Sequence, residues 1–306
     1  MTKITNDRSV TKLLEALKGL FSEEQAFLLP RRHMSFVCGA KDELGTVGSS
    51  SLRKQFLDYL SENDDENLIL PILAEKAIQE FLAAKTDTAL DLGSFESLIA
   101  NCVDSILIFP ESPGSFAELG FFAAMPDVIA KTLVANLDAY QGNSFINLGL
   151  MPFYNTDSVY KPMIIIGKNV SEGFAQVQER LLINNSSTRY RKRFPEEEFK
   201  AHSPKNQLIA LYELMRAFGY LTEENLFRVI PLVFGAYDLV IVHRLLAILV
   251  AMRYVRRNEH GDYLVQNSAP SLLEYKNDLF DKARTQVRLY YDKHDKEAYS
   301  QLEGLL

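Results

Sequence analysis

Apolar residues follow two different patterns along this chain. Between residues 34 and 185, short runs of consecutive apolar residues alternate with segments in which apolar residues recur at helical spacing. The runs occupy residues 34–40, 67–73, 105–109, 132–137 and 162–166. Strands that are apolar throughout and separated by helices are typical of parallel sheets covered on both faces. We therefore predict an α/β fold, with a Rossmann-like (flavodoxin-like) parallel sheet and helices on both of its faces.

The C-terminal third of the chain predicts a different, mostly α-helical arrangement. Amphipathic patterns indicate one helix over 206–222, a second that begins at Thr222, and a third over 239–254. Two short apolar runs around the turn 258–261 indicate a hairpin. Three helices followed by a hairpin are typical of a winged helix-turn-helix. From about residue 270 to 305 the charged pattern predicts a long helix or a helix pair.

These patterns divide the chain into four segments. Residues 1–33 form an N-terminal helical extension, with apolar positions at helical spacing over 9–22. Residues 34–185 form the α/β domain. Residues 186–205 are polar, charged and proline-containing, which predicts a linker. Residues 206–306 form a winged-helix-like domain with C-terminal helices.

Length and composition favour an intracellular globular protein. At 306 residues the chain exceeds the usual size of one core, so we expect two domains. Its 47% hydrophobic and 24% charged residues are ordinary values for a globular chain. Cys38 and Cys102 each lie in an apolar run, which favours a reducing compartment. We recognise no signal peptide and no apolar run near the about 20 residues that span a bilayer, so we expect a cytoplasmic protein without a membrane segment.

Basic residues gather in two clusters, although the net charge is −7. The clusters are Arg189, Arg191, Lys192 and Arg193, and Arg253, Arg256 and Arg257. The second falls at the end of the third helix and in the hairpin, where winged helices contact the nucleic-acid backbone. Solvated faces and linkers carry similar clusters, so both interpretations stay open. The third helix itself is very apolar, which favours a core or a protein interface over deep base reading.

Residues 96–121 contain the pattern that points to a catalytic site. The pattern predicts a helix, a buried strand, and a Pro/Gly/Ser turn that opens a second helix. Glycine lets the backbone approach a ligand closely, and a helix N-terminus offers N–H groups to anionic or hydroxyl-rich groups. We expect Glu118 in the first turn of the second helix, with its carboxylate directed toward the same site. The helix dipole also favours glutamate in a first turn, so a structural role stays open.

Asp104, Cys38 and the histidines receive no catalytic or metal-binding role. Asp104 precedes a buried strand, and we expect it to fix a turn. Cys38 has no histidine near it in sequence, and we expect a packed residue at a strand end rather than a nucleophile. The five histidines show no metal-ligand spacing, so we expect no metal and no cofactor.

Three motifs between about residues 34 and 166 resemble those of the nucleoside 2-deoxyribosyltransferase family. They are the strand end Phe36-Val37-Cys38-Gly39-Ala40, the pair Glu96 and Asp104, and the helix start Gly114-Ser115-Phe116-Ala117-Glu118-Leu119-Gly120. The resemblance implies that Glu118 is the nucleophile that takes the sugar. It also implies substrate contacts, which would be made by Cys38, Gly39, Ala40, Glu96, Ser112, Gly114 and Ser115. Ser112 stands where some members have an aspartate that handles the base, a departure that favours bond cleavage over base exchange.

The chemistry fits this assignment. Breaking an N-glycosidic bond builds positive charge on the sugar, and a carboxylate beneath the anomeric carbon stabilises that charge or forms a covalent intermediate. Nicotinamide is already cationic in NAD and leaves with little acid assistance. An enzyme without the base-handling aspartate can therefore cleave NAD, which would be a substrate rather than a cofactor.

The pairing of the two domains resembles, over nearly the whole chain, the effector proteins of retrons. The resemblance implies a toxic N-glycosidase in antiphage defence that acts on a nucleotide such as NAD. It implies that a reverse transcriptase and its multicopy single-stranded DNA/RNA hold the effector inactive. It also implies a homo-oligomer or a larger assembly with that partner complex.

Other functions stay open. A nucleotide-sensing, DNA-binding regulator would bind the nucleotide without cleaving it. A salvage nucleoside deoxyribosyltransferase would move the sugar between two bases. A phosphoribohydrolase is close in chemistry, although that family has a richer glycine motif before its glutamate. A dinucleotide-binding Rossmann site is excluded, because no G-x-G-x-x-G follows the first strand.

Overall fold

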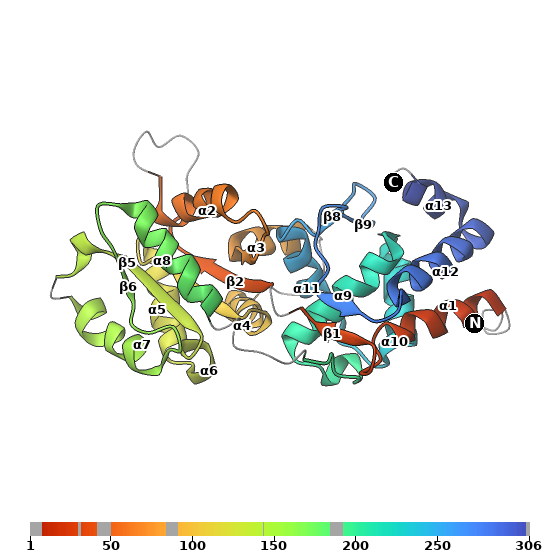
Figure 1. The fold of residues 1–306 in the computed structure, drawn as a ribbon, viewed down its shortest axis with the longest axis horizontal. Helices are drawn as coiled ribbons and strands as arrows, with labels where there is room; N and C mark the ends of the chain where they lie inside the picture. The colour runs from red at the N-terminus through yellow and green to blue at the C-terminus, as the bar shows by residue number, and fades with distance from the viewer. Residues whose placement is uncertain are drawn as a thin grey trace. The chain divides into compact units, whose positions relative to one another are not determined.

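The computed structural model describes residues 8–29, 32–41, 50–83, 91–142, 144–183 and 192–303. The chain forms two compact units (Figure 1). The sheet unit consists of Pro30–Ala74 and Glu96–Arg189. The helical unit consists of Met1–Leu29, Glu75–Phe95 and Tyr190–Leu306. The N-terminal segment and the stretch before Glu96 therefore cluster with the C-terminal part of the chain.

Five parallel strands form the centre of the sheet unit. They are β2 (His33–Cys38), β3 (Ile69–Ile72), β4 (Ser105–Ile108), β5 (Thr132–Leu137) and β6 (Ile164–Ile166). Their order is β3-β2-β4-β5-β6, and every neighbouring pair is parallel. This is the flavodoxin-like order, in which the direction of strand addition reverses between β2 and β4. The predicted α/β fold is confirmed, and each of the five apolar runs contains a strand.

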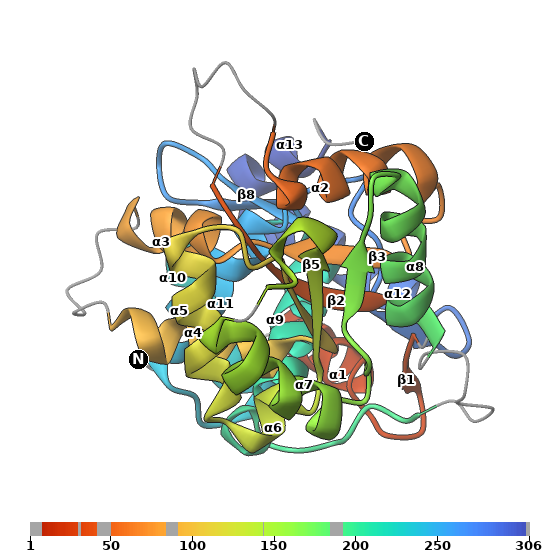
Figure 2. The ribbon, with the colours of Figure 1, turned by 90° about the vertical axis from the view of Figure 1, so that its left-hand side faces the viewer.

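Helices cover both faces of this sheet (Figure 2). The helices of the unit are α2 (Leu52–Asn63), α4 (Leu92–Cys102, from Glu96 onward in this unit), α5 (Pro113–Ala123), α6 (Pro126–Ile129), α7 (Met151–Asp157) and α8 (Val170–Ile183). On one face, Phe56 of α2 and Phe174 of α8 pack with Val37 and Leu107 of the strands. On the other face, the rings of Phe36 and Phe122 of α5 meet edge to face, 6.0 Å apart. Burial on both faces explains why these strands are apolar throughout.

The helical unit contains three helices followed by a hairpin, as predicted. Its order is α9 (Pro204–Phe218), β7 (Tyr220–Leu221), α10 (Glu223–Phe234), α11 (Leu239–Ala251), β8 (Val255–Arg257) and β9 (Tyr263–Val265). The strands form an antiparallel sheet with the order β7-β9-β8. Thr222 caps α10 and Asp238 caps α11 through side-chain oxygens. The third helix ends at Ala251, three residues earlier than the predicted bound at 254.

Both ends of the chain contribute to the helical unit. The elements are α1 (Arg8–Gly19), β1 (Ala26–Leu28), α3 (Ala74–Ala83, from Glu75 onward in this unit), β10 (Leu273–Tyr275), α12 (Leu279–His294) and α13 (Lys296–Glu303). β1 pairs antiparallel with β10. The prediction of helix alone after residue 270 is therefore wrong at its start, because a strand precedes the two helices. A three-residue strand has no local pattern, and β10 exists through its pairing with a segment from the opposite end of the chain.

A buried glutamate joins α9 to β10. Glu213 is 0% exposed, and its carboxylate accepts hydrogen bonds from the backbone N–H groups of Leu272 (2.6 Å) and Leu273 (3.2 Å). It also accepts from the Tyr275 hydroxyl at 3.0 Å and from Arg216 Nε at 2.8 Å. Charge-assisted bonds of this kind are about twice as strong as neutral ones. Burial, followed by the Glu213 charge, raises the pKa of Tyr275 well above its usual value.

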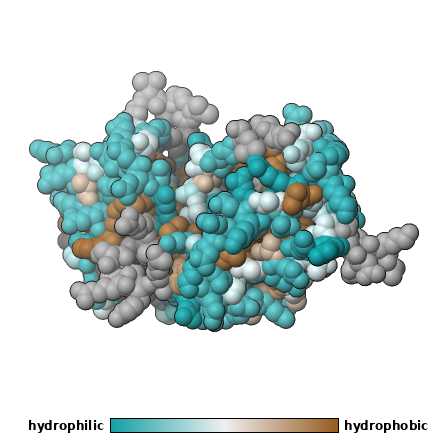
Figure 3. Space-filling model, turned by 45° about the vertical axis from the view of Figure 1, so that its right-hand side comes forward, coloured by the Kyte–Doolittle hydropathy of each residue, from teal (hydrophilic) through white to brown (hydrophobic). Residues whose placement is uncertain are grey.

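One face of the molecule is mainly hydrophilic, with scattered apolar residues (Figure 3). Among the described helices, no single one is both long and apolar enough to cross a bilayer. α10 and α11 reach that length and composition only together, and they are bent by 113° at the break between them.

We predict that Glu213→Gln lowers the free energy of unfolding by about 3 kcal/mol, because the amide leaves buried donors and Arg216 without their anionic acceptor. Urea denaturation measures the change. Glu224→Gln is the matched control, since this exposed side chain pairs with Arg228 on the same helix, and we expect a change within about 0.5 kcal/mol. Equal midpoints for both variants would contradict the role of Glu213.

Candidate functional site

Glu111 organises the carboxyl ends of the central strands. It follows β4, and its carboxylate accepts hydrogen bonds from the backbone N–H groups of Ala40 (3.0 Å), Leu52 (2.7 Å) and Arg53 (3.1 Å). Ala40 lies just after β2, and the other two residues begin α2. The free N–H groups and the positive dipole end of a helix favour an anion at this position. Glu111 was not expected from the sequence, because its partners are far away along the chain.

Glycine is required at position 39, because the end of β2 lies very close to α2 and to Glu111. A Cβ atom added at Gly39 would lie 2.7 Å from Arg53 Cβ and 2.9 Å from Glu111 Oε1, both closer than real contacts allow. The glycine therefore lets the end of β2 approach α2 and the Glu111 carboxylate. Gly114 is different, since an added Cβ would meet only Ser112 Oγ at 3.9 Å.

Two serines begin α5. Ser112 is the N-cap, and its hydroxyl accepts from the Ser115 N–H at 3.2 Å. The Ser115 hydroxyl accepts in turn from the N–H groups of Ser112 (2.9 Å) and Glu111 (3.1 Å). This reciprocal arrangement satisfies donors at the helix start. Both hydroxyls predicted to contact substrate thus take part in the cap of α5.

Glu118 lies in the second turn of α5, and the prediction of a first-turn position is wrong. The helix begins at Pro113, and its first turn contains no acidic residue. The Pro/Gly/Ser turn contributes the cap and the first three helical residues, which places Glu118 one turn further along. The dipole effect falls off within the first turn. It therefore does not explain a half-buried glutamate at this position.

The structure brings Cys38, Glu96 and Glu118 together. Cys38 ends β2 and is 1% exposed. Burial raises the pKa of its thiol well above the usual value, and the Glu118 carboxylate, which accepts a hydrogen bond from the thiol, raises it further. Glu96 of α4 also raises this pKa, whereas Arg53 lowers it. The thiol stays protonated, which agrees with a packed residue rather than a nucleophile.

Two further groups near Cys38 were not expected from the sequence. Arg53 is 7% exposed and contributes positive charge beside the two acids. Tyr154 of α7 is buried, and its hydroxyl donates to the carbonyl oxygen of Leu119 at 2.6 Å. Burial and the Cys38 thiol raise the pKa of Tyr154. Burial also raises the pKa of Glu96 above its usual value, so this acid retains a proton to higher pH than an exposed glutamate.

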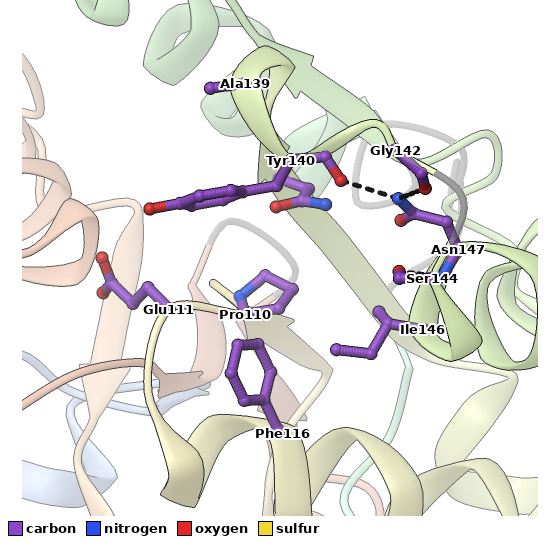
Figure 4. Close-up of a pocket in the computed structure, with 10 residues that line it drawn as sticks. Pro110, Glu111, Phe116, Ala139, Tyr140, Gly142, Ser144, Ile146 and Asn147 are labelled. Carbon is purple, nitrogen blue, oxygen red and sulfur yellow. Dashed lines mark hydrogen bonds between the residues drawn. The ribbon is translucent and has the colours of Figure 1, made fainter.

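A cavity of about 570 Å³ opens at the carboxyl ends of β4 and β5, beside Glu111 (Figure 4). Its described walls include the rings of Phe116 and Tyr140, which are 40% and 57% exposed, and the polar side chains of Glu111, Asn136 and Asn147. The volume is in the range of small-molecule sites. None of the residues predicted to contact substrate lines it, although all of them are described. Glu111 lines the cavity and also accepts the hydrogen bond from Ala40 just after β2.

Asn147 orders one wall of the cavity. Its Nδ2 donates to the carbonyl oxygens of Tyr140 (2.6 Å) and Gly142 (2.7 Å), as the dashed lines in Figure 4 show. The residue lies in a π-helical turn, Ile146–Leu150, of a kind often found at functional sites. The position of Tyr140 at the cavity therefore depends on Asn147.

Asp104 lies at the opposite edge of the sheet. Its carboxylate accepts from the Met34 N–H at 3.0 Å, and its own N–H donates to the Met34 carbonyl at 2.9 Å. Asp104 therefore joins the amino ends of β2 and β4, and its structural interpretation is confirmed. Among the residues that the structure describes, no three His, Cys, Asp or Glu side chains are grouped so as to hold a metal ion.

The predicted basic residues are only partly described. Arg189 and Arg191 lie outside the described residues, whereas Lys192 and Arg193 are exposed. Arg253 and Arg256 are exposed too. Arg257 differs, because its guanidinium pairs with Glu223 at 3.3 Å.

We predict a pH-dependent stability contribution from Cys38. Its pKa is raised in the folded protein, so this contribution is complete below the pKa of the unfolded thiol, about 8.5, and is lost as the pH rises above it. Serine does not ionise in this range. The stability difference between wild type and Cys38→Ser should fall by up to about 1.4 kcal/mol per pH unit above pH 8.5, measured by urea unfolding from pH 7 to 10. A difference that is independent of pH would contradict the buried, protonated thiol.

Comparison with known proteins places these features in a family. An Escherichia coli protein named "Retron Ec86 putative ribosyltransferase/DNA-binding protein" is 32% identical over 130 residues, which cover 41% of this chain and 39% of that protein. The chain thus matches about two fifths of that relative's length. The family described as STM3845 retron effector protein matches residues 49–257, more than half of the chain. The chain therefore belongs to the STM3845 retron effector protein family.

Proposed function

We propose that this retron effector is an N-glycosidase that cleaves the bond between base and sugar in a nucleotide, with NAD as its substrate and Glu118 as its catalytic carboxylate. The observation that carries the proposal is the position of Glu118. Its half-buried carboxylate accepts the Cys38 hydrogen bond at the end of β2, beside the strand-order reversal where flavodoxin-like folds bind ligands. The name of the Escherichia coli relative, which includes ribosyltransferase, supports the same class of chemistry.

The arrangement around Glu118 suits charge development on a sugar. When the C–N bond breaks, the base leaves with the bonding electrons and positive charge grows at the anomeric carbon. A carboxylate already oriented by the Cys38 thiol stabilises that charge without reorganisation. Water then supplies the oxygen for the new bond to the anomeric carbon and loses a proton. Glu96, whose pKa is raised by burial, is suited to accept that proton.

The cavity suits the rest of a nucleotide. Phe116 and Tyr140 offer aromatic surface to a planar ring, and Asn136 and the Oδ1 atom of Asn147 offer polar groups to its edge. Nicotinamide combines a planar ring with a carboxamide. Neutral nicotinamide leaves NAD without prior protonation, which fits Ser112 at the position where some of the resembling transferases have a base-handling aspartate.

We propose that the helical unit binds the retron partners. The order α9–β7–α10–α11–β8–β9 matches that of a winged helix, a common nucleic-acid-binding module. The relative's name also includes DNA-binding protein. In this proposal, a reverse transcriptase and its multicopy single-stranded DNA/RNA hold the glycosidase inactive until phage infection, when release makes it toxic. The predicted oligomer or larger assembly belongs to the same proposal.

We predict that Glu118→Gln slows nicotinamide release from NAD by at least about a hundredfold, because it removes the negative charge beneath the sugar. Chromatography of free nicotinamide measures the rate with purified protein. Glu62→Gln, an exposed change on α2 in the same unit, is the matched control and should retain wild-type turnover. Equal turnover in the wild type and Glu118→Gln would remove Glu118 from the mechanism.

One observation favours a second candidate, a nucleotide-sensing, DNA-binding regulator. The hydroxyls of Ser112 and Ser115 belong to the cap of α5, and Glu118 does not line the cavity. Such a protein would bind NAD in the cavity and change its nucleic-acid affinity without releasing a base. Detection of free nicotinamide with purified wild type would eliminate this candidate.

A further inference from the structure

The third helix of a winged helix normally presents one open face to a nucleic-acid groove. In α11, five consecutive residues, Leu245–Leu249, are at most 5% exposed. Successive helical residues are 100° apart, so five of them cover the whole circumference. The C-terminal half of α11 therefore has no open face.

The N-terminal half of α11 also lacks side chains that are available to read bases. Direct readout uses hydrogen-bonding side chains such as Arg, Asn and Gln. The only polar residues in LVIVHRLLAILVA are His243 and Arg244. His243 lies 3.7 Å from the Glu223 carboxylate and packs edge to face on Phe227. Burial lowers its pKa, which favours the neutral imidazole.

The Arg244 side chain contacts two residues that directly precede Glu96. Its Nη1 donates to Ser94 Oγ at 3.1 Å, and its guanidinium lies 5.9 Å from the centre of the Phe95 ring. Glu80 of α3 shares a small hollow with His243 and other α11 residues. All of these residues belong to the helical unit. The protein itself thus covers the surface that would face a groove.

Two arginines next to α11 remain open to a ligand. Arg253 and Arg256 are exposed, and neither side chain has a hydrogen-bond or ion-pair partner among the described residues. Arg256 lies on β8, an edge strand of the three-stranded sheet. Arg253 has φ +60 because it directly follows the C-cap of α11, where its N–H donates to the Val250 carbonyl and the Tyr254 N–H donates to the Leu249 carbonyl. Arg257, by contrast, pairs with Glu223.

We infer that this unit binds nucleic acid through the phosphate backbone alone, with Arg253 and Arg256 as contacts and α11 as a packing helix that reads no bases. Exposed guanidinium groups contact phosphates regardless of sequence. The partner is therefore nucleic acid of any sequence. This inference rests on the proposed nucleic-acid contact and is independent of the proposed glycosidase activity.

Fluorescence anisotropy of the full chain tests the inference. The probes are two single-stranded 20-nucleotide DNAs and two 20-base-pair duplexes, each pair unrelated in sequence. We expect Kd values within about twofold inside each pair. The double variant Arg253→Gln/Arg256→Gln should weaken binding to all probes by a similar factor and reduce the salt slope on duplex by about 1.8, or 0.9 for each lost phosphate contact.

Matched variants separate this surface from α11. Arg228→Gln removes an exposed arginine that pairs with Glu224, and Leu239→Gln changes the 50% exposed first residue of α11. Both should leave every Kd unchanged. Thermal melting of all variants controls for folding, since each altered side chain is exposed.

Three results would overturn the inference in distinguishable ways. A preference above tenfold for one sequence, or an effect of Leu239→Gln on one sequence only, would show base reading by α11. Wild-type affinity in the Arg253/Arg256 double variant would show that another surface binds. No binding of the wild type to any probe at low salt would overturn the proposed nucleic-acid contact as well.

Discussion

The proposed site depends on the carboxylate of Glu111. Its two oxygens accept N–H groups from the end of β2 and from the first turn of α2, and its own N–H donates to Ser115 at the start of α5. One residue therefore fixes the three segments that meet where the strand order reverses. Charge-assisted hydrogen bonds to a helix N-terminus are strong enough to hold such segments in register. Gly39 makes the arrangement sterically possible.

Charge balance connects this framework with the proposed chemistry. Glu96 and Glu118 both act on the protonated thiol of Cys38, and Arg53 is the nearby positive charge. Two carboxylates in a partly buried site repel each other, which raises the free energy of the site when no ligand is bound. Positive charge that develops on a sugar would reduce that cost, so the site would favour the transition state over the empty state. The aromatic cavity next to Glu111 offers the space that a planar leaving group needs.

The helical unit also contains a carboxylate that joins distant segments of the chain. The buried Glu213 joins α9 to β10, as Glu111 joins β2 to α2. In both cases a carboxylate satisfies backbone donors that come from distant parts of the chain. The C-terminal half of α11 then packs on all sides, and Arg256 on the edge strand β8 is an exposed positive charge next to it. A fold with the element order of a winged helix can thus keep its third helix for packing.

The sequence by itself determined the class of fold and the five strands of the central sheet. Its apolar runs matched the five strands, because a strand buried on both faces needs a continuous run of apolar residues. It also indicated Glu118, although it placed this residue one turn too early. Only the tertiary structure decided that Glu111 binds the backbone of Arg53, that Arg53 lies near Cys38, and that β1 pairs with β10. These contacts join residues far apart in the chain, and local periodicity contains no information about them.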